Sequence, residues 1–137
     1  MKESNGFLLN QIAGMFWVNL EKLMAEIGIH AGQVFVLFAL WESDGQSQAE
    51  IVRNLQVTAP TVYNMVVRLE KAGFVETRKS PQDARVQLVN LTRKGLEIRP
   101  QVERQWNKLE DMIFAELNET EKMMLQLLLK KLKKKLI

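Results

Sequence analysis

The sequence predicts a mainly α-helical fold with a small antiparallel sheet of two or three strands. Three observations support this prediction. Apolar residues recur every three or four positions along most of the 137-residue chain, which is the period of an amphipathic helix. Two short runs rich in β-formers lie past the middle of the chain, on either side of a polar loop. Capping residues mark where several of the helices begin.

The composition is that of a globular protein, with 47% hydrophobic and 26% charged residues. The absence of cysteine excludes disulfides, thiolate metal sites and a cysteine nucleophile. The longest apolar run, 34–41, is far shorter than the roughly 20 residues of a membrane-spanning helix. The first residues lack the apolar stretch of a signal peptide. We therefore expect a cytoplasmic protein that does not enter a membrane.

Charge is distributed unevenly along the chain. The formal net charge of +3 combines −4 in residues 1–52, +5 in residues 53–95 and +2 in residues 96–137. The middle third is thus the electropositive part, and five lysines near the C-terminus form a second basic cluster.

The first two helices are predicted over residues 7–27 and 31–42. Gly28 follows the first helix and is a typical C-cap residue. The second helix is almost entirely apolar, so it must be buried on most sides, and residues 43–45 end it.

A pair of shorter helices follows. Ser47 and Glu50 have the spacing of a capping box, which starts the first of them. Residues 55–57 interrupt this helix, and a new helix is predicted from Thr58 to about Ala72.

Two strands are predicted over residues 74–78 and 86–91, joined by the polar, proline-containing loop 79–85. The remainder is predicted to be helical. One long helix is expected over residues 92–117, kinked at Pro100 at a cost of about 3 kcal/mol. Asn118 then caps a last helix that reaches Leu136.

Helix, turn, helix and two-stranded hairpin, in this order, are the elements of a winged helix-turn-helix. Its second helix, 58–72, fits the major groove of DNA, and the hairpin loop reaches the neighbouring minor groove. Arg78, Lys79 and Arg85 on the hairpin supply the basic side chains that bind phosphate or enter a narrow minor groove. The sequence therefore predicts a protein that binds double-stranded DNA.

The stretch from Gly28 to Gly95 resembles the MarR/SlyA family of transcriptional regulators. The resemblance lies in the order and spacing of short pieces: 29–33 at the start of the second helix, Thr61-Val62, Arg68-Leu69-Glu70-Lys71-Ala72-Gly73-Phe74-Val75, Asp83-Ala84-Arg85 and Leu91-Thr92-Arg93-Lys94-Gly95. The flanking helices also suit the family, so the resemblance covers nearly the whole chain.

The resemblance implies a homodimer that reads a pseudo-palindromic site, typically as a repressor that a small aromatic or amphipathic ligand releases. Residues 28–95 would form the DNA-binding domain, and residues 1–27 and 96–137 a helical dimerisation region. Arg85 corresponds to the arginine at the wing tip and Asp83 to the carboxylate that holds it. The recognition-helix positions that face DNA in the family are occupied by Thr61, Tyr63, Asn64 and Arg68. For Tyr63, packing against the helix-turn-helix core is an equal alternative.

The last helix carries an apolar stripe formed by Leu125, Leu129, Leu132 and Leu136. We expect this stripe to bury against a second copy of the chain. A basic amphipathic helix can also lie on a membrane surface or bind a partner protein, and these interpretations remain alternatives. A non-specific architectural DNA-binding protein is a further alternative, because it would show the same basic residues.

An enzyme is not expected. The sequence has no cysteine, one histidine, no phosphate-binding glycine loop and no known nucleophile or zinc motif. The single histidine, His30, is too little for a transition-metal site and is expected to cap a helix or lie at the surface. No metal or other cofactor is therefore predicted.

Overall fold

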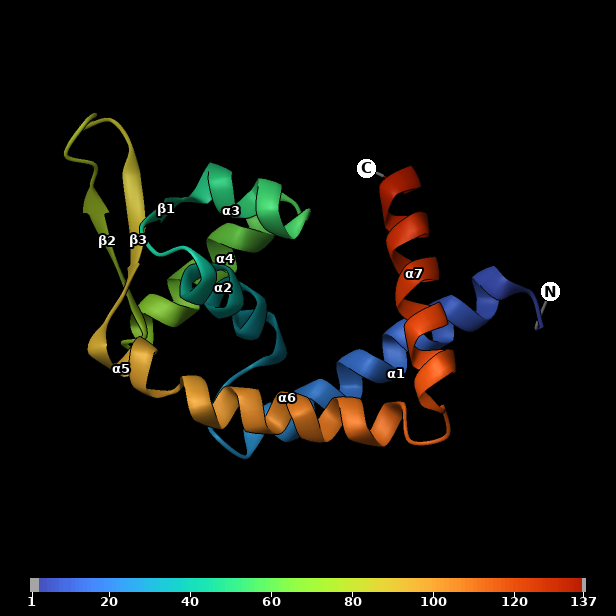
Figure 1. Ribbon diagram of the computed structural model, residues 1–137. Helices are drawn as coiled ribbons and strands as arrows, with labels where there is room; N and C mark the ends of the chain where they lie inside the picture. Colours follow the sequence, from blue (N-terminus) through green and yellow to red (C-terminus); the bar gives the residue numbers. More distant parts are fainter. Residues whose placement is uncertain (1–2, 137) are drawn as a thin grey trace.

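In the computed structural model, which describes residues 3–136, seven helices and three strands follow one another along the chain (Figure 1). The helices are α1 (Asn5–Ala25), α2 (Ala31–Glu42), α3 (Gln48–Leu55), α4 (Ala59–Lys71), α5 (Arg93–Glu97), α6 (Arg99–Ile113) and α7 (Glu119–Leu136). The strands are β1 (Gln46–Ser47), β2 (Val75–Lys79) and β3 (Gln87–Leu91). The predicted class, mainly α with a small antiparallel sheet, is confirmed.

The sheet is antiparallel, with strand order β1-β3-β2. Val75 lies opposite Leu91 at the base of the β2–β3 hairpin, and Lys79 lies opposite Gln87 near its tip. The third strand, β1, pairs Gln46 with Val89 and thereby fixes β3 to the segment before α3. A strand of two residues has no periodicity that a sequence could reveal.

The hydrophobic core lies between α2, α3, α4 and the base of the hairpin. α2 is buried along most of its length, as its apolar sequence predicted. Val62, Val66 and Leu69 of α4 and Ile51 of α3 complete this part of the core. α1 and α6 pack against each other (Figure 1) and extend the core with Leu20, Met24, Val102 and Leu109.

Three of the predicted helix starts are confirmed by hydrogen bonds. The Ser47 hydroxyl accepts from the Glu50 amide at 3.2 Å, while the Glu50 carboxylate accepts from the Ser47 amide. Thr58 caps α4. The Asn118 side chain accepts from the Glu121 amide at 2.8 Å, and the Glu121 carboxylate accepts from the Asn118 amide at 3.0 Å.

The expectation of one kinked helix over residues 92–117 is wrong. The chain forms two helices, α5 and α6, which meet at Ile98, and α6 ends at Ile113. Pro100 lies in the first turn of α6, where an amide has no partner within the helix. The loss of a hydrogen bond that a mid-helix proline causes is therefore avoided.

α7 leaves the end of α6 steeply and stands apart from the helix-turn-helix core (Figure 1). None of its residues is buried. No helix among residues 3–136 is both long enough and apolar enough to cross a membrane.

Candidate nucleic-acid interface

Helix α4 presents an exposed polar face because its buried residues all point into the core. The Thr58 hydroxyl accepts from the Thr61 amide at 3.4 Å and starts the helix. Val62, Val66 and Leu69 are buried, whereas the four residues predicted from the sequence are exposed, namely Thr61, Tyr63, Asn64 and Arg68. Tyr63 is 56% exposed, so it lies at the surface of α4 and is not part of the buried core.

The hairpin of β2 and β3 forms a wing that projects from the helical core (Figure 1). Asp83 lies in its loop and holds Arg85 through three hydrogen bonds. The carboxylate accepts from the Arg85 amide at 3.0 Å, from Nε at 3.1 Å and from Nη2 at 3.1 Å. These bonds from Arg85 hold the pKa of Asp83 below its ordinary value. The arginine side chain nevertheless stays 91% exposed, so it is oriented and accessible at the same time.

The other two predicted basic residues lie on β2. Arg78 and Lys79 are both exposed, and the Arg78 guanidinium pairs with the Glu76 carboxylate two residues earlier. The predicted residues therefore form two groups, one on the face of α4 and one along the wing. A surface of this kind offers hydroxyl, amide and guanidinium groups to base edges and phosphates.

The turn between α4 and β2 is held by residues at the start of α5. Gly73 adopts a φ of 83°, a conformation that side chains disfavour. The Thr92 hydroxyl donates to the Gly73 carbonyl at 2.6 Å, and the Lys94 ammonium donates to the Ala72 carbonyl at 2.6 Å. The Thr92 amide donates to the Phe74 carbonyl at 3.0 Å. These contacts join segments about 20 residues apart, so local sequence patterns did not reveal them.

Glu21 of α1 ties the start of α2 to the first helix, and sequence reasoning missed it as well. Its carboxylate accepts from the Ala31 amide at 2.8 Å and lies 2.9 Å from Nδ1 of His30. His30 is the residue that precedes α2, and its amide donates to the Gln33 side chain. The Ala31 amide, then His30 and, more weakly, Arg68 hold the pKa of Glu21 below its ordinary value.

Glu21 should make the stability of the protein depend on pH in the acidic range. Because the pKa is lowered from 4.5, its stabilisation is complete above that pH and is lost as the pH falls through the lowered value. We expect the urea midpoint to drop as the pH is lowered below about 4.5, and to drop less for Glu21→Gln. Parallel curves for the two proteins would contradict this role of the carboxylate.

A pocket of about 350 Å³ with a mixed polar and apolar lining lies beside α4, between α1 and the start of α2. Its lining includes Trp17 and Glu21 from α1, His30, and Thr61, Asn64 and Arg68 from α4. Three of the four predicted α4 residues therefore border the same cavity. Among residues 3–136, no group of three or more His, Asp or Glu side chains is arranged to hold a metal ion.

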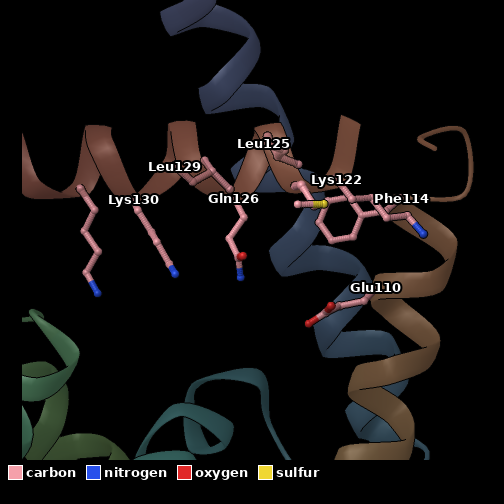
Figure 2. Close-up of a pocket in the computed structure, with 9 residues that line it drawn as sticks. Glu110, Phe114, Lys122, Leu125, Gln126, Leu129 and Lys130 are labelled. Carbon is pink, nitrogen blue, oxygen red and sulfur yellow. The ribbon is translucent and has the colours of Figure 1, made fainter. Parts of the chain in front are cut away.

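The four leucines predicted for dimerisation lie on α7, where Leu125 is half-buried and Leu129, Leu132 and Leu136 are exposed. A groove of about 450 Å³ lies between the end of α6 and the face of α7 that runs from Lys122 to Lys133. Phe114, Gln126 and Lys130 project into this groove (Figure 2). The first half of α1 also exposes large apolar side chains: Phe7, Leu8, Leu9, Ile12 and Met15. The two ends of the chain thus carry apolar surfaces that the chain itself does not cover.

Comparison with known proteins gives concordant matches. The model of the MarR family matches residues 29–86. The HTH-type transcriptional repressor IacR from Pseudomonas putida is 31% identical over 91 residues, which cover 66% of this chain and 54% of the repressor. The chain spans about half the length of that relative.

Two solved structures are similar to the fold over almost its whole length. Bordetella bronchiseptica BpsR, described in the context of its regulation by 6-hydroxynicotinic acid, matches with a TM-score of 0.90 and 23% identity, covering 97% of this chain and 95% of BpsR. Staphylococcus aureus MepR, solved in complex with DNA, matches with a TM-score of 0.84 and 23% identity, covering 98% of this chain and 97% of MepR. These two likenesses show the winged helix fold with its flanking helices.

Proposed function

This chain belongs to the MarR family, and we propose that it is a sequence-specific DNA-binding transcriptional regulator that acts as a homodimeric repressor. The observation that carries the proposal is that the same domain has an exposed polar face on α4 and, at the tip of the wing, an exposed arginine that Asp83 orients. The proposal assigns the protein no catalytic reaction, and it places the protein in the cytoplasm together with its DNA.

In the proposed complex, α4 enters the major groove, where Thr61, Tyr63, Asn64 and Arg68 face base edges and phosphates. Arg85 enters the adjacent minor groove, whose negative potential attracts it. Arg78 and Lys79 lie along the strand that leads to the wing tip and bind phosphates on the way.

In this proposal, the polar and basic surface binds DNA and the apolar surfaces form the dimer. Residues 28–95 read DNA, and residues 1–27 and 96–137 join two copies through the apolar surfaces of α1 and α7. The dimer places two α4 helices about 34–36 Å apart, which matches one turn of the duplex. A pseudo-palindromic site is the DNA that such a dimer recognises.

Regulation by a small ligand is part of the proposal. The pocket beside α4 touches α1, α2 and the DNA-facing residues at once. An aromatic or amphipathic molecule that binds there and favours the wrong separation of the two α4 helices would weaken DNA binding by its difference in affinity for the two states. The regulation of BpsR by 6-hydroxynicotinic acid supports this idea by analogy.

The test is fluorescence anisotropy with labelled duplexes, taken from upstream of the protein's own gene and from a random library enriched on the protein. Binding that withstands random-sequence competitor and weakens with added salt is the expected result. A protein that random DNA displaces completely from every enriched duplex would be a non-specific architectural binder instead.

Arg85→Ala should weaken binding to the enriched duplex by about 1–3 kcal/mol and reduce the preference for A·T pairs at its flanks. Affinity is lost because the substitution removes the only arginine of the loop, whose guanidinium Asp83 orients. Titrations on duplexes with A·T and G·C flanks check it. Arg93→Ala is the matched control, because Arg93 is equally exposed but lies on α5 and pairs with Glu97. Equal affinities of wild type and Arg85→Ala would remove Arg85 from the interface.

A further inference from the structure

The proposed function requires that α4 and the wing keep a fixed position relative to each other. The helix places its side chains in the major groove and the wing places Arg85 in the minor groove, so a change in the angle between them would misplace Arg85. Only the short turn 72–74 connects α4 to β2 along the chain. What holds the wing against the helix therefore matters for recognition.

A hydrogen bond links the last turn of α4 to the middle of β2. The Thr77 amide donates to Oε2 of Glu70 at 3.1 Å. Thr77 lies opposite Val89, and β2 is an edge strand of the sheet, so this amide points away from β3 and toward the helix. Within the part of the chain that the structure describes, it is the only hydrogen bond between an α4 side chain and the hairpin.

The two strands of the wing are anchored differently. β3 is fixed by its pairing with β1 at Gln46 and Ser47, whereas β2 has no strand on its outer side within residues 3–136. The turn at its base is held separately by Thr92 and Lys94. Glu70 contacts the hairpin further along β2, at Thr77, and so supports the outer edge of β2, which pairs with no other strand within residues 3–136.

Arg78, Lys79 and the loop that carries Arg85 lie beyond this contact. Because Asp83 ties Arg85 to the loop through three hydrogen bonds, a tilt of the hairpin at Thr77 moves the guanidinium together with the loop. We propose, on the basis of the function proposed above, that Glu70 is a positioning residue that sets the wing against α4 and thereby places Arg85 in the minor groove.

An effect of the Glu70 charge and a positioning role of Glu70 predict opposite changes in DNA affinity when the carboxylate is removed, so the two can be distinguished by experiment. Glu70 is exposed on the helix that faces DNA, so removing its negative charge should by itself tighten binding to phosphate-rich DNA. If the carboxylate positions the wing, removing it should weaken binding instead. The substitution Glu70→Gln keeps a side-chain oxygen that can accept from the Thr77 amide, so it should preserve the position of the wing.

The experiment compares the variants with the wild type on the enriched duplex. We expect Glu70→Ala to weaken binding by about threefold to tenfold and Glu70→Gln to stay within about twofold of the wild type. In an Arg85→Ala background, Glu70→Ala should cause a smaller loss than in the wild type, because Arg85 is gone and only the phosphate contacts of Arg78 and Lys79 remain to be misplaced. Glu97→Ala, which removes an exposed carboxylate from α5, is the control for charge and should not weaken binding.

Circular dichroism and thermal unfolding show whether each variant is folded at the assay temperature. Unchanged or tighter binding by folded Glu70→Ala, or an equal loss with and without Arg85, would overturn the role of Glu70 while leaving the function intact. A wild-type protein that enriches no sequence would overturn the proposed function itself. The two failures are therefore distinguishable.

Discussion

Replacing both Leu129 and Leu132 with glutamate is expected to leave a folded monomer that no longer binds its DNA site. Both leucines lie on α7 and expose 43% and 52% of their surface, and α7 contributes no buried residue to the chain's own core. The substitution therefore spares the fold of the single chain. In a dimer seam, two unpaired carboxylates would cost several kcal/mol, on the order of 2–5 kcal/mol each.

The loss of the dimer should also abolish tight DNA binding. In a dimer, binding of one α4 helix to DNA makes binding of the second intramolecular, which raises the affinity for the site. A monomer lacks this increase, which is on the order of 10²–10⁴ in affinity. Light scattering measures the molar mass, and anisotropy on the enriched duplex measures the affinity.

The matched control is the double substitution Lys131→Gln and Lys134→Gln. It lowers the net charge by the same two units on the same helix and with the same spacing, but it leaves the leucines in place. We expect this control to stay dimeric. A Leu129→Glu, Leu132→Glu protein that remained dimeric would show that α7 does not form the seam.

Gly95→Ala should destabilise the folded protein by about 3 kcal/mol or more. A Cβ at this position would lie 2.1 Å from the Phe74 carbonyl oxygen and 3.2 Å from its carbonyl carbon. Both are backbone atoms, so neither can rotate aside, and α5 would have to move away from the turn after α4. The Trp41 indole, which donates to the Gly95 carbonyl at 2.9 Å, would be disturbed by the same movement.

Urea denaturation of wild type and variant measures this difference in the free energy of unfolding. Gly6→Ala serves as the control, because a Cβ there meets nothing within 4 Å and alanine is the better helix former. We expect Gly6→Ala to be as stable as the wild type or slightly more so. If Gly95→Ala were equally stable, the close approach of α5 to Phe74 would be refuted.

Features that depend on neighbouring residues could be predicted from the sequence. The bounds of α2 agree with the prediction, and the caps at Ser47, Thr58 and Asn118 form as their spacing indicated. Each of these signals acts over three or four residues, which is the range over which side chains and backbone determine a helix end. The Asp83–Arg85 pair also joins neighbouring residues, but the resemblance to the family implied it, not the local spacing.

Features that depend on distant residues could not be predicted. The sequence predicts Pro100 in the interior of one helix that Thr92 caps, whereas the break at Ile98 places this proline in the first turn of α6. Glu21 caps a helix that begins ten residues later, and β1 exists only because β3 lies beside it. The Gly95–Phe74 approach depends on two segments that meet only in the folded chain.

The internal pairing of the wing tip bears on how such a protein searches a chromosome. Because Asp83 neutralises Arg85 locally, the tip adds little to the long-range attraction that retains a protein on arbitrary sequence. Its guanidinium is already oriented by Asp83, so less rotamer freedom is lost when it enters a fitting groove. If Arg85 enters the minor groove as proposed, the pair shortens residence on random DNA while it preserves residence at the correct site, so the ratio of the residence time at the correct site to that on random DNA increases.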